Sequence, residues 1–201
     1  MKITQLKQQV KRADRFSIYV DDKYSFSLST DELLTAQIHV GMELTSSELS
    51  DLVKLSENSL VKAQCYHYVS YRLRSKWEME TYIKRKGHSP QIIEDTVKYL
   101  IEKKLVDDNE FANRWIENRL LLKPTSINIL KLELKQKHIS SEIINSALKD
   151  HEIDELPIIN QLIEKKRQQS KYHDDLKLMQ FLARRGFSYD LIKKALNNTS
   201  D

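Results

Sequence analysis

The sequence is poor in residues that interrupt helices and in residues that crosslink a chain. Its 201 residues include three glycines, three prolines and one cysteine, Cys65. So few glycines and prolines favour long helices over a β-sandwich or an open parallel sheet. A single cysteine excludes an intramolecular disulfide and is typical of a reducing compartment.

Long hydrophobic runs are also missing. The first residues, MKITQLKQQVKRADR, have no apolar stretch of the kind that marks a signal peptide. Nowhere does the chain have the run of about 18 apolar residues that would indicate a transmembrane helix. We therefore expect a soluble, cytoplasmic protein that does not bind a membrane.

The residue patterns of common catalytic sites are absent as well. The three glycines lie far apart, so they form no phosphate-binding loop, and Cys65 and His67 have no partners at metal-ligand spacing. Asp107 and Asp108 are adjacent, but they directly precede a helical segment, where carboxylates usually cap the helix. We expect no enzymatic activity, no metal and no cofactor.

A repeat is the main feature that is present. Residues 83–93 (IKRKGHSPQII) align with residues 134–144 (LKQKHISSEII) and with residues 182–192 (LARRGFSYDLI). Copies at this spacing with helical patterning indicate an array of structural repeats. Each copy reads as the basic end of a helix, a tight turn, a serine cap and a short apolar-faced helix. Glycine at two of the three turns suits a left-handed helix end.

Residues 1–58 have a different pattern. Aromatic and β-branched residues in 16–20 and 24–28 flank the polar turn Asp21-Asp22-Lys23, which predicts a β-hairpin. Residues 3–10 fit either a strand or a helical turn. A short helix is expected from Thr30, and the capping box Thr45–Glu48 predicts a long helix that extends toward Tyr71.

The predicted fold is mostly α: tandem three-helix repeats in an elongated, curved array, with a small N-terminal β-hairpin region. The expected parts are residues 1–58 for the hairpin and a short helix, then 59–106, 107–154 and 155–201 for the three repeats. Ile93, Ile144 and Ile192 are equivalent in this register, and all three are expected to be buried between helices.

Basic residues are concentrated between Leu60 and His88, where seven lysines and arginines face two glutamates, a net charge of +5. Lys84, Arg85 and Lys86 are consecutive, so they spread over about 200° of a helix and cannot all face a core. The same helix end is basic in the later repeats. Either these residues form a solvated surface, or they contact an anionic partner along successive repeats. Tyr68 and Tyr71 suit stacking on unpaired bases or bridging two helices.

Residues 68–75 (YVSYRLRS) resemble a motif of the RecX family of recombination regulators. Other family motifs follow in the family's order: 84–87 (KRKG), 105–112 (LVDDNEFA), 123–124 (KP), 132–137 (LELKQK) and 182–188 (LARRGFS). The resemblance covers roughly residues 60–197. Two positions depart from the family pattern, since Leu73 replaces a proline and His138 a glycine. The N-terminal hairpin is similar to an extension of longer members.

The resemblance implies a non-enzymatic regulator that lies along the groove of the RecA–DNA filament. Such proteins inhibit strand exchange and ATP hydrolysis, and so act in homologous recombination, DNA repair and the SOS response. It implies RecA as a protein partner and weaker binding to single- and double-stranded DNA, and we expect a monomer. The candidate contact residues are Arg72, Arg74, Lys84, Arg85, Lys86, Lys135, Lys137, Arg184, Arg185, Tyr68 and Tyr71. The alternative is a stand-alone DNA-binding protein of helix-turn-helix type.

Overall fold

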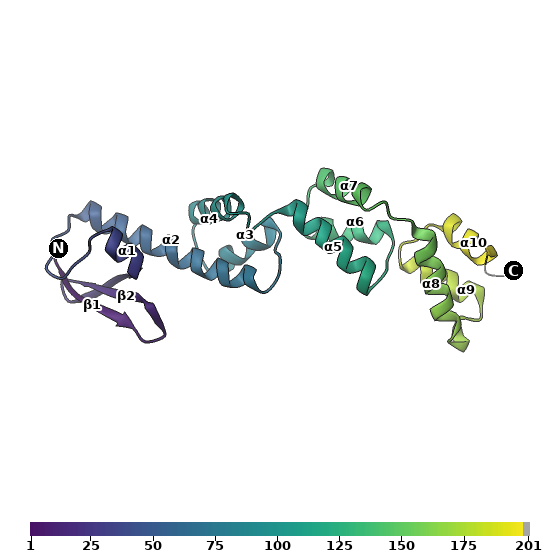
Figure 1. Cartoon of the computed structure of the whole chain (residues 1–201), viewed down its shortest axis with the longest axis horizontal. Helices are drawn as coiled ribbons and strands as arrows, with labels where there is room; N and C mark the ends of the chain where they lie inside the picture. Colours follow the sequence, from purple (N-terminus) through teal and green to yellow (C-terminus); the bar gives the residue numbers. More distant parts are fainter. Residues whose placement is uncertain (199–201) are drawn as a thin grey trace. The chain divides into compact units, whose positions relative to one another are not determined.

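The computed structural model describes residues 1–198, which are mostly helical with one small sheet at the N-terminus (Figure 1). The chain divides into two compact units. One contains residues 1–72 and 83–99, and the other contains residues 73–82 and the chain from residue 100 onward. Among residues 1–198, no helix is both long enough and apolar enough to cross a lipid bilayer.

The N-terminal sheet has three antiparallel strands in the order β1 (Ile3–Gln9), β2 (Arg12–Val20) and β3 (Lys23–Ser29). The predicted hairpin is therefore confirmed, and the segment before it forms a strand. Asp21 and Asp22 both have positive φ, 49° and 64°. This left-handed conformation is what a tight turn between right-twisted strands requires.

A small sheet is marginally stable by itself and needs a packing partner. Here the buried residues Ile3, Ile18 and Leu28 belong to a core against which Leu49 and Leu52 from α2 (Ser46–Ser70) pack. Helix α1 (Thr30–Thr35) begins at a capping box of Ser29 and Glu32, and α2 begins at the predicted box of Thr45 and Glu48. Because α2 is one continuous helix, the division expected at residue 58 falls inside it.

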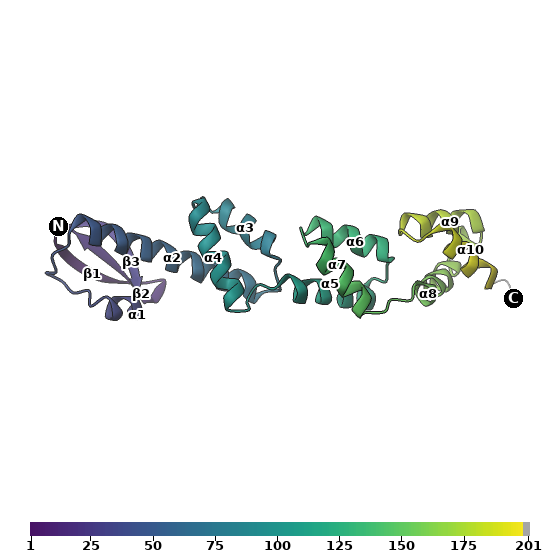
Figure 2. The same cartoon turned by 90° about the horizontal axis from the view of Figure 1, so that it is seen from above.

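The rest of the chain forms three-helix repeats, as predicted. The C-terminal part of α2 belongs to the first repeat with α3 and α4, the second repeat contains α5 to α7, and the third contains α8 to α10 (Figure 2). The helix bounds are α3 Lys76–Arg85, α4 Pro90–Glu102, α5 Asp108–Leu122, α6 Ile127–Gln136, α7 Ser141–Asp150, α8 Glu155–Arg167, α9 Asp175–Arg184 and α10 Tyr189–Asn198.

The cores of the second and third repeats confirm the alignment of residues 134–144 with residues 182–192. Leu134 and Leu182 are equivalent and fully buried, and so are Ile144 and Ile192, each 1% exposed. Ile93 departs from the expectation, because it is only partly buried. The repeats therefore share their register, but the first does not enclose this position as the others do.

The turn between the second and third helices of each repeat has the same left-handed backbone. Its central residue is Gly87, His138 or Gly186, with φ of +87°, +58° and +81°. Histidine thus adopts, in the second repeat, a conformation that glycine adopts more easily. The turn geometry is the same in all three repeats even where the glycine is replaced.

Candidate nucleic-acid interface

The basic helix end of the first repeat is exposed to solvent. Lys84 and Arg85 lie in the last turn of α3, and Lys86 follows directly. All three side chains belong to the exposed class, as does Gly87. His88 leaves this surface and contacts Glu57 of α2, with 3.1 Å between Nδ1 and Oε1. The basic end of α3 is thus a solvent-exposed surface that an anionic partner can reach.

The residues around the end of α2 differ in exposure. Tyr71 is 69% exposed, and its hydroxyl lies 3.0 Å from Nε2 of His67 one turn earlier in the helix. Tyr68 is partly buried, Arg72 is exposed and Arg74 is partly buried. Tyr71 is therefore the better placed of the two tyrosines for stacking on a base.

The structure separates the two lysines of the second repeat. Lys135 is exposed, but Lys137 donates to Oε1 of Glu78 at 2.7 Å. The Glu78 side chain is 8% exposed, so its charge would be costly to bury without this partner. Lys137 also lies over the ring of Trp115, 5.4 Å from its centroid. The charge of Lys137 is therefore engaged in contacts within the protein.

Lys137 is part of a contact in which the turn of one repeat packs against the start of a helix from the repeat before it. Ser75 is fully buried, accepts the backbone N–H of Glu78 and donates to the carbonyl of Lys137 at 3.1 Å. The ring of His138 stacks on Trp77, with 4.3 Å between centroids. The residue that replaces the family's glycine thus has a packing partner.

The same contact recurs between the second and third repeats. Ser126 is the equivalent of Ser75, is also fully buried and caps α6 through the backbone N–H of Ile129. The turn at Gly186 packs against it, and Asn128 donates from Nδ2 to the Gly186 carbonyl at 3.0 Å. A Cβ at Gly186 would lie 2.5 Å from Oγ of Ser126. Only glycine fits this approach.

Arg184 and Arg185 lie at the end of α9 beside this turn. Arg185 donates from Nη1 to the carbonyl of Pro124 at 3.2 Å, and its guanidinium lies 5.3 Å from the centroid of the Phe181 ring. Arg184 is exposed. Of the two arginines, one is held by a neighbouring repeat and one projects into solvent.

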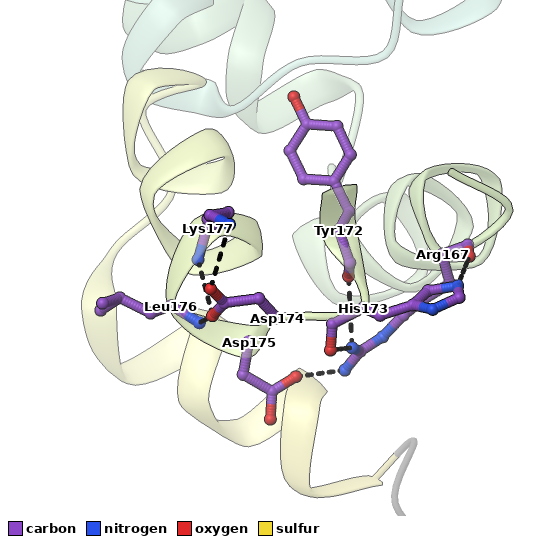
Figure 3. Close-up of polar contacts among 7 residues, drawn as sticks. All are labelled: Arg167, Tyr172, His173, Asp174, Asp175, Leu176 and Lys177. Atoms are coloured by element: carbon purple, nitrogen blue, oxygen red, sulfur yellow. Dashed lines mark hydrogen bonds and ion pairs between the residues drawn. The ribbon is translucent and has the colours of Figure 1, made fainter. Parts of the chain in front are cut away.

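The loop before α9 holds the other end of this helix (Figure 3). Asp174 caps α9 by accepting the backbone N–H groups of Leu176 and Lys177, at 2.8 and 3.4 Å. Arg167 donates to the carbonyls of Tyr172 and His173 and pairs with Asp175. These bonds fix the start of the helix that carries Arg184 and Arg185 at its end.

Sequence reasoning missed two further cations near these arginines, Arg119 and Lys123. They lie at and just after the end of α5. The alignment of the repeats is the sequence signal that could have identified them. When residues 83–93 are aligned with residues 134–144, Arg119 and Lys123 fall on Tyr68 and Arg72, which were both candidates.

The acidic and thiol groups have structural environments. Asp107 caps α5 through the N–H groups of Asn109 and Glu110, as predicted, whereas Asp108 accepts the backbone N–H of Lys76 at the start of α3, 2.8 Å away. Burial raises the pKa of Asp108. Burial also raises the pKa of the Cys65 thiol to about 12, so this cysteine is protonated at neutral pH. Within residues 1–198, no group of three or more His, Cys, Asp or Glu side chains is placed to hold a metal ion.

Comparison with known proteins gives four matches to models of one family, and together they span most of the chain. The model of the regulatory protein RecX N-terminal domain matches residues 1–45. The RecX first, second and third three-helix domains match residues 62–100, 107–148 and 154–196. The order of the models follows the order of the sheet and the three repeats.

Individual relatives agree with these matches. The chain is 30% identical over 205 residues to regulatory protein RecX of Bacillus licheniformis, covering 98% of this chain and 77% of the relative. It is 28% identical over 200 residues to that of Bacillus subtilis, covering 97% and 76%.

Two crystal structures share the fold. One, of regulatory protein RecX, superposes with a TM-score of 0.73 and 23% identity over 98% of both chains. The other, of RecX from Lactobacillus salivarius, has a TM-score of 0.61 and 24% identity over 70% of this chain and 95% of that one.

Proposed function

Because the chain belongs to the RecX family of regulatory proteins, we propose that it regulates a RecA recombinase by binding along the RecA–DNA filament. It restrains ATP hydrolysis and strand exchange, and so modulates homologous recombination and DNA repair. It works in the cytoplasm as a monomer without enzymatic activity of its own. The family membership of every part of the chain, from the sheet to the third repeat, carries this proposal.

The exposed basic helix ends support contact with an anionic filament. The first repeat presents Lys84, Arg85 and Lys86, the second presents Lys135, and the third presents Arg184. A filament offers its phosphates and acidic side chains at regular intervals, so a protein with repeated basic sites can engage it several times. Several weak contacts then combine into tight binding.

The candidate contact residues differ in exposure and in their contacts within the protein. The first choice for direct contact with the filament is the group Lys84, Arg85 and Lys86. Tyr71 is the more exposed of the two candidate tyrosines, so it is the better choice for stacking on an unpaired base. Lys137 is the weakest choice, because separating it from Glu78 would remove a cationic partner from a buried carboxylate. Binding at Lys137 would therefore lower the stability of the protein.

The decisive measurement is the rate of DNA-dependent ATP hydrolysis by RecA with and without this protein. We expect the protein to lower the rate, and a rate unchanged at saturating protein would refute the proposal. Tight, sequence-dependent binding to bare duplex, with no effect on RecA, would instead favour a stand-alone helix-turn-helix protein.

A charge-reversal variant tests the contact residues. Replacing Lys84, Arg85 and Lys86 by glutamate should leave helix content and melting nearly unchanged, because solvated charges contribute little to stability. The same change should sharply weaken binding to RecA–DNA filaments. The matched control reverses three exposed lysines of the later repeats, Lys149→Glu, Lys193→Glu and Lys194→Glu.

Titration at several salt concentrations separates the two partners. If the three residues meet phosphates, each lost contact should reduce the salt slope of binding by about 1. If they meet acidic side chains of RecA, affinity should fall while the length and type of the DNA matter little. Filament binding that is unchanged in the folded variant would remove these residues from the interface.

A further inference from the structure

A cleft of about 230 Å³ lies between the second and third repeats. One wall comes from the end of α5 and the loop that follows, and another from the end of α9; α6 also contributes residues to the lining. Its lining includes Arg119, Lys123, Ile129, Glu133, Arg184 and Arg185. Four cations therefore face one carboxylate.

The single carboxylate is already engaged. Glu133 accepts Nε of Arg119 at 2.8 Å and Nε1 of Trp115 at 2.9 Å. By contrast, the side chains of Lys123 and Arg184 make no hydrogen bond or ion pair with any residue in the described range 1–198. The cleft therefore holds an excess of positive charge that the protein does not compensate.

The equivalent positions of the preceding repeats show what has changed. Lys137 is the equivalent of Arg185, and it is neutralised by the buried Glu78. Ile129 takes the place of Glu78 in the second repeat, so among residues 1–198 Arg185 has no carboxylate partner and donates instead to the carbonyl of Pro124. Arg184 likewise takes the place of the neutral Gln136. Both differences make the net charge at the contact between the second and third repeats more positive.

We propose that this cleft binds a phosphate group of a nucleic-acid strand. Guanidinium groups match phosphate oxygens in pairs, and Arg185 is held in place by the Pro124 carbonyl and the Phe181 ring, so little side-chain freedom is lost on binding. The tetrahedral oxygens of a phosphate can be contacted from both walls at once, whereas a carboxylate offers two oxygens in one plane. The inference rests on the proposed function and places one DNA contact at the third repeat.

The first test measures binding of the full chain to a labelled oligothymidylate strand by fluorescence anisotropy. We compare the wild type with the double variant Lys123→Gln, Arg184→Gln. Loss of the phosphate contact in this cleft should reduce the salt slope by about 0.7, the value for one phosphate contact with a single strand. The dissociation constant at low salt should rise about tenfold or more. The control, Lys193→Gln with Lys194→Gln, removes the same charge from exposed positions of α10 and should bind like the wild type.

A second test restores the missing acid. Ile129→Glu recreates the residue of the first repeat, and we expect it to pair with Arg185 and weaken oligonucleotide binding. Ile129→Gln has nearly the same shape without the charge and should bind much more tightly than Ile129→Glu. Equal binding by these two variants would overturn the charge argument, and circular dichroism confirms that both are folded.

Other outcomes would also overturn the proposal. They are wild-type affinity and salt slope in the double variant, an equal loss in the α10 control, or displacement of the strand by polyglutamate as readily as by unlabelled strand at equal charge. The last result would assign the cleft to an acidic peptide. The RecA assay stays separate: a wild type that binds the strand through the cleft but leaves ATP hydrolysis unchanged would refute the regulatory function and not the cleft.

Discussion

Gly186→Ala tests how the third repeat packs on the second. Gly186 has φ of +81°, and an added Cβ would lie 2.5 Å from Oγ of Ser126 and 2.8 Å from Cγ1 of Ile129. Neither atom can move away easily. Ser126 is fully buried and caps α6, and the Ile129 atom lies close to the backbone. The substitution must therefore displace a helix cap, an apolar side chain or the turn.

Gly87→Ala is a matched control, because Gly87 has nearly the same backbone conformation, with φ of +87°. No atom in the described part of the chain, residues 1–198, lies within 4 Å of an added Cβ there. Gly87→Ala should cost only the left-handed strain of a non-glycine residue, about 1 kcal/mol. Gly186→Ala should add about 1–3 kcal/mol for overpacking. Its total cost of about 2–4 kcal/mol is a large share of a typical stability of about 5–15 kcal/mol.

The measurement is urea unfolding of both variants, in which the helical circular dichroism signal is monitored at several wavelengths. We expect the midpoint for Gly186→Ala to fall well below that for Gly87→Ala, with a separate early loss of helix if the third repeat unfolds alone. Equal midpoints for the two variants would refute the close approach between Gly186 and Ser126.

Three further predictions concern the cores and caps. Ile144→Ala and Ile192→Ala should each lower the free energy of unfolding by about 2–5 kcal/mol, whereas Ile93→Ala should lower it less because that side chain is only partly buried. Melting temperatures of the three variants test this, and similar decreases in all three would contradict the difference in burial. Cys65, whose thiol pKa is about 12, should not react with Ellman's reagent at pH 8 in the native protein but should react fully in guanidinium, so a rapid native reaction would refute its burial. The pKa of Asp108 is raised by burial, so the folded chain holds this proton more tightly than the unfolded chain, and stability should fall as pH rises from the ordinary value of 3.8 through the raised value. Asp108→Asn should remove this dependence in urea titrations across that range, and an unchanged dependence would contradict the burial of the charge.

Much of the fold could be predicted from the sequence, because it depends on residues close together in the chain. The repeat was visible as aligned helix ends and turns, and the hairpin followed from alternating apolar residues around Asp21 and Asp22. Serine at position 140 caps its helix through hydrogen bonds to residues of the next turn. Such local geometry needs no knowledge of the tertiary structure, so α1 begins at Thr30 and α2 begins directly after its cap Thr45, as expected.

The sequence did not predict which charged side chains are exposed and which are paired within the protein. Lys135 and Lys137 looked alike as basic residues at a helix end, yet one is exposed and the other is paired with Glu78. Asp108 was expected to cap a helix, and it does, but the helix is α3 and not its own. In each case the deciding partner comes from an earlier helix that is distant in the sequence.

The sequence by itself therefore determined the repeats, their turns and the basic end of each second helix, since these follow from local hydrogen bonding and periodicity. Only the tertiary structure decided which cations are neutralised and which are left facing solvent. The reason is that compensation requires a carboxylate within a few ångströms, and packing between successive repeats supplies one at Glu78 and an isoleucine, Ile129, at the equivalent position of the next repeat.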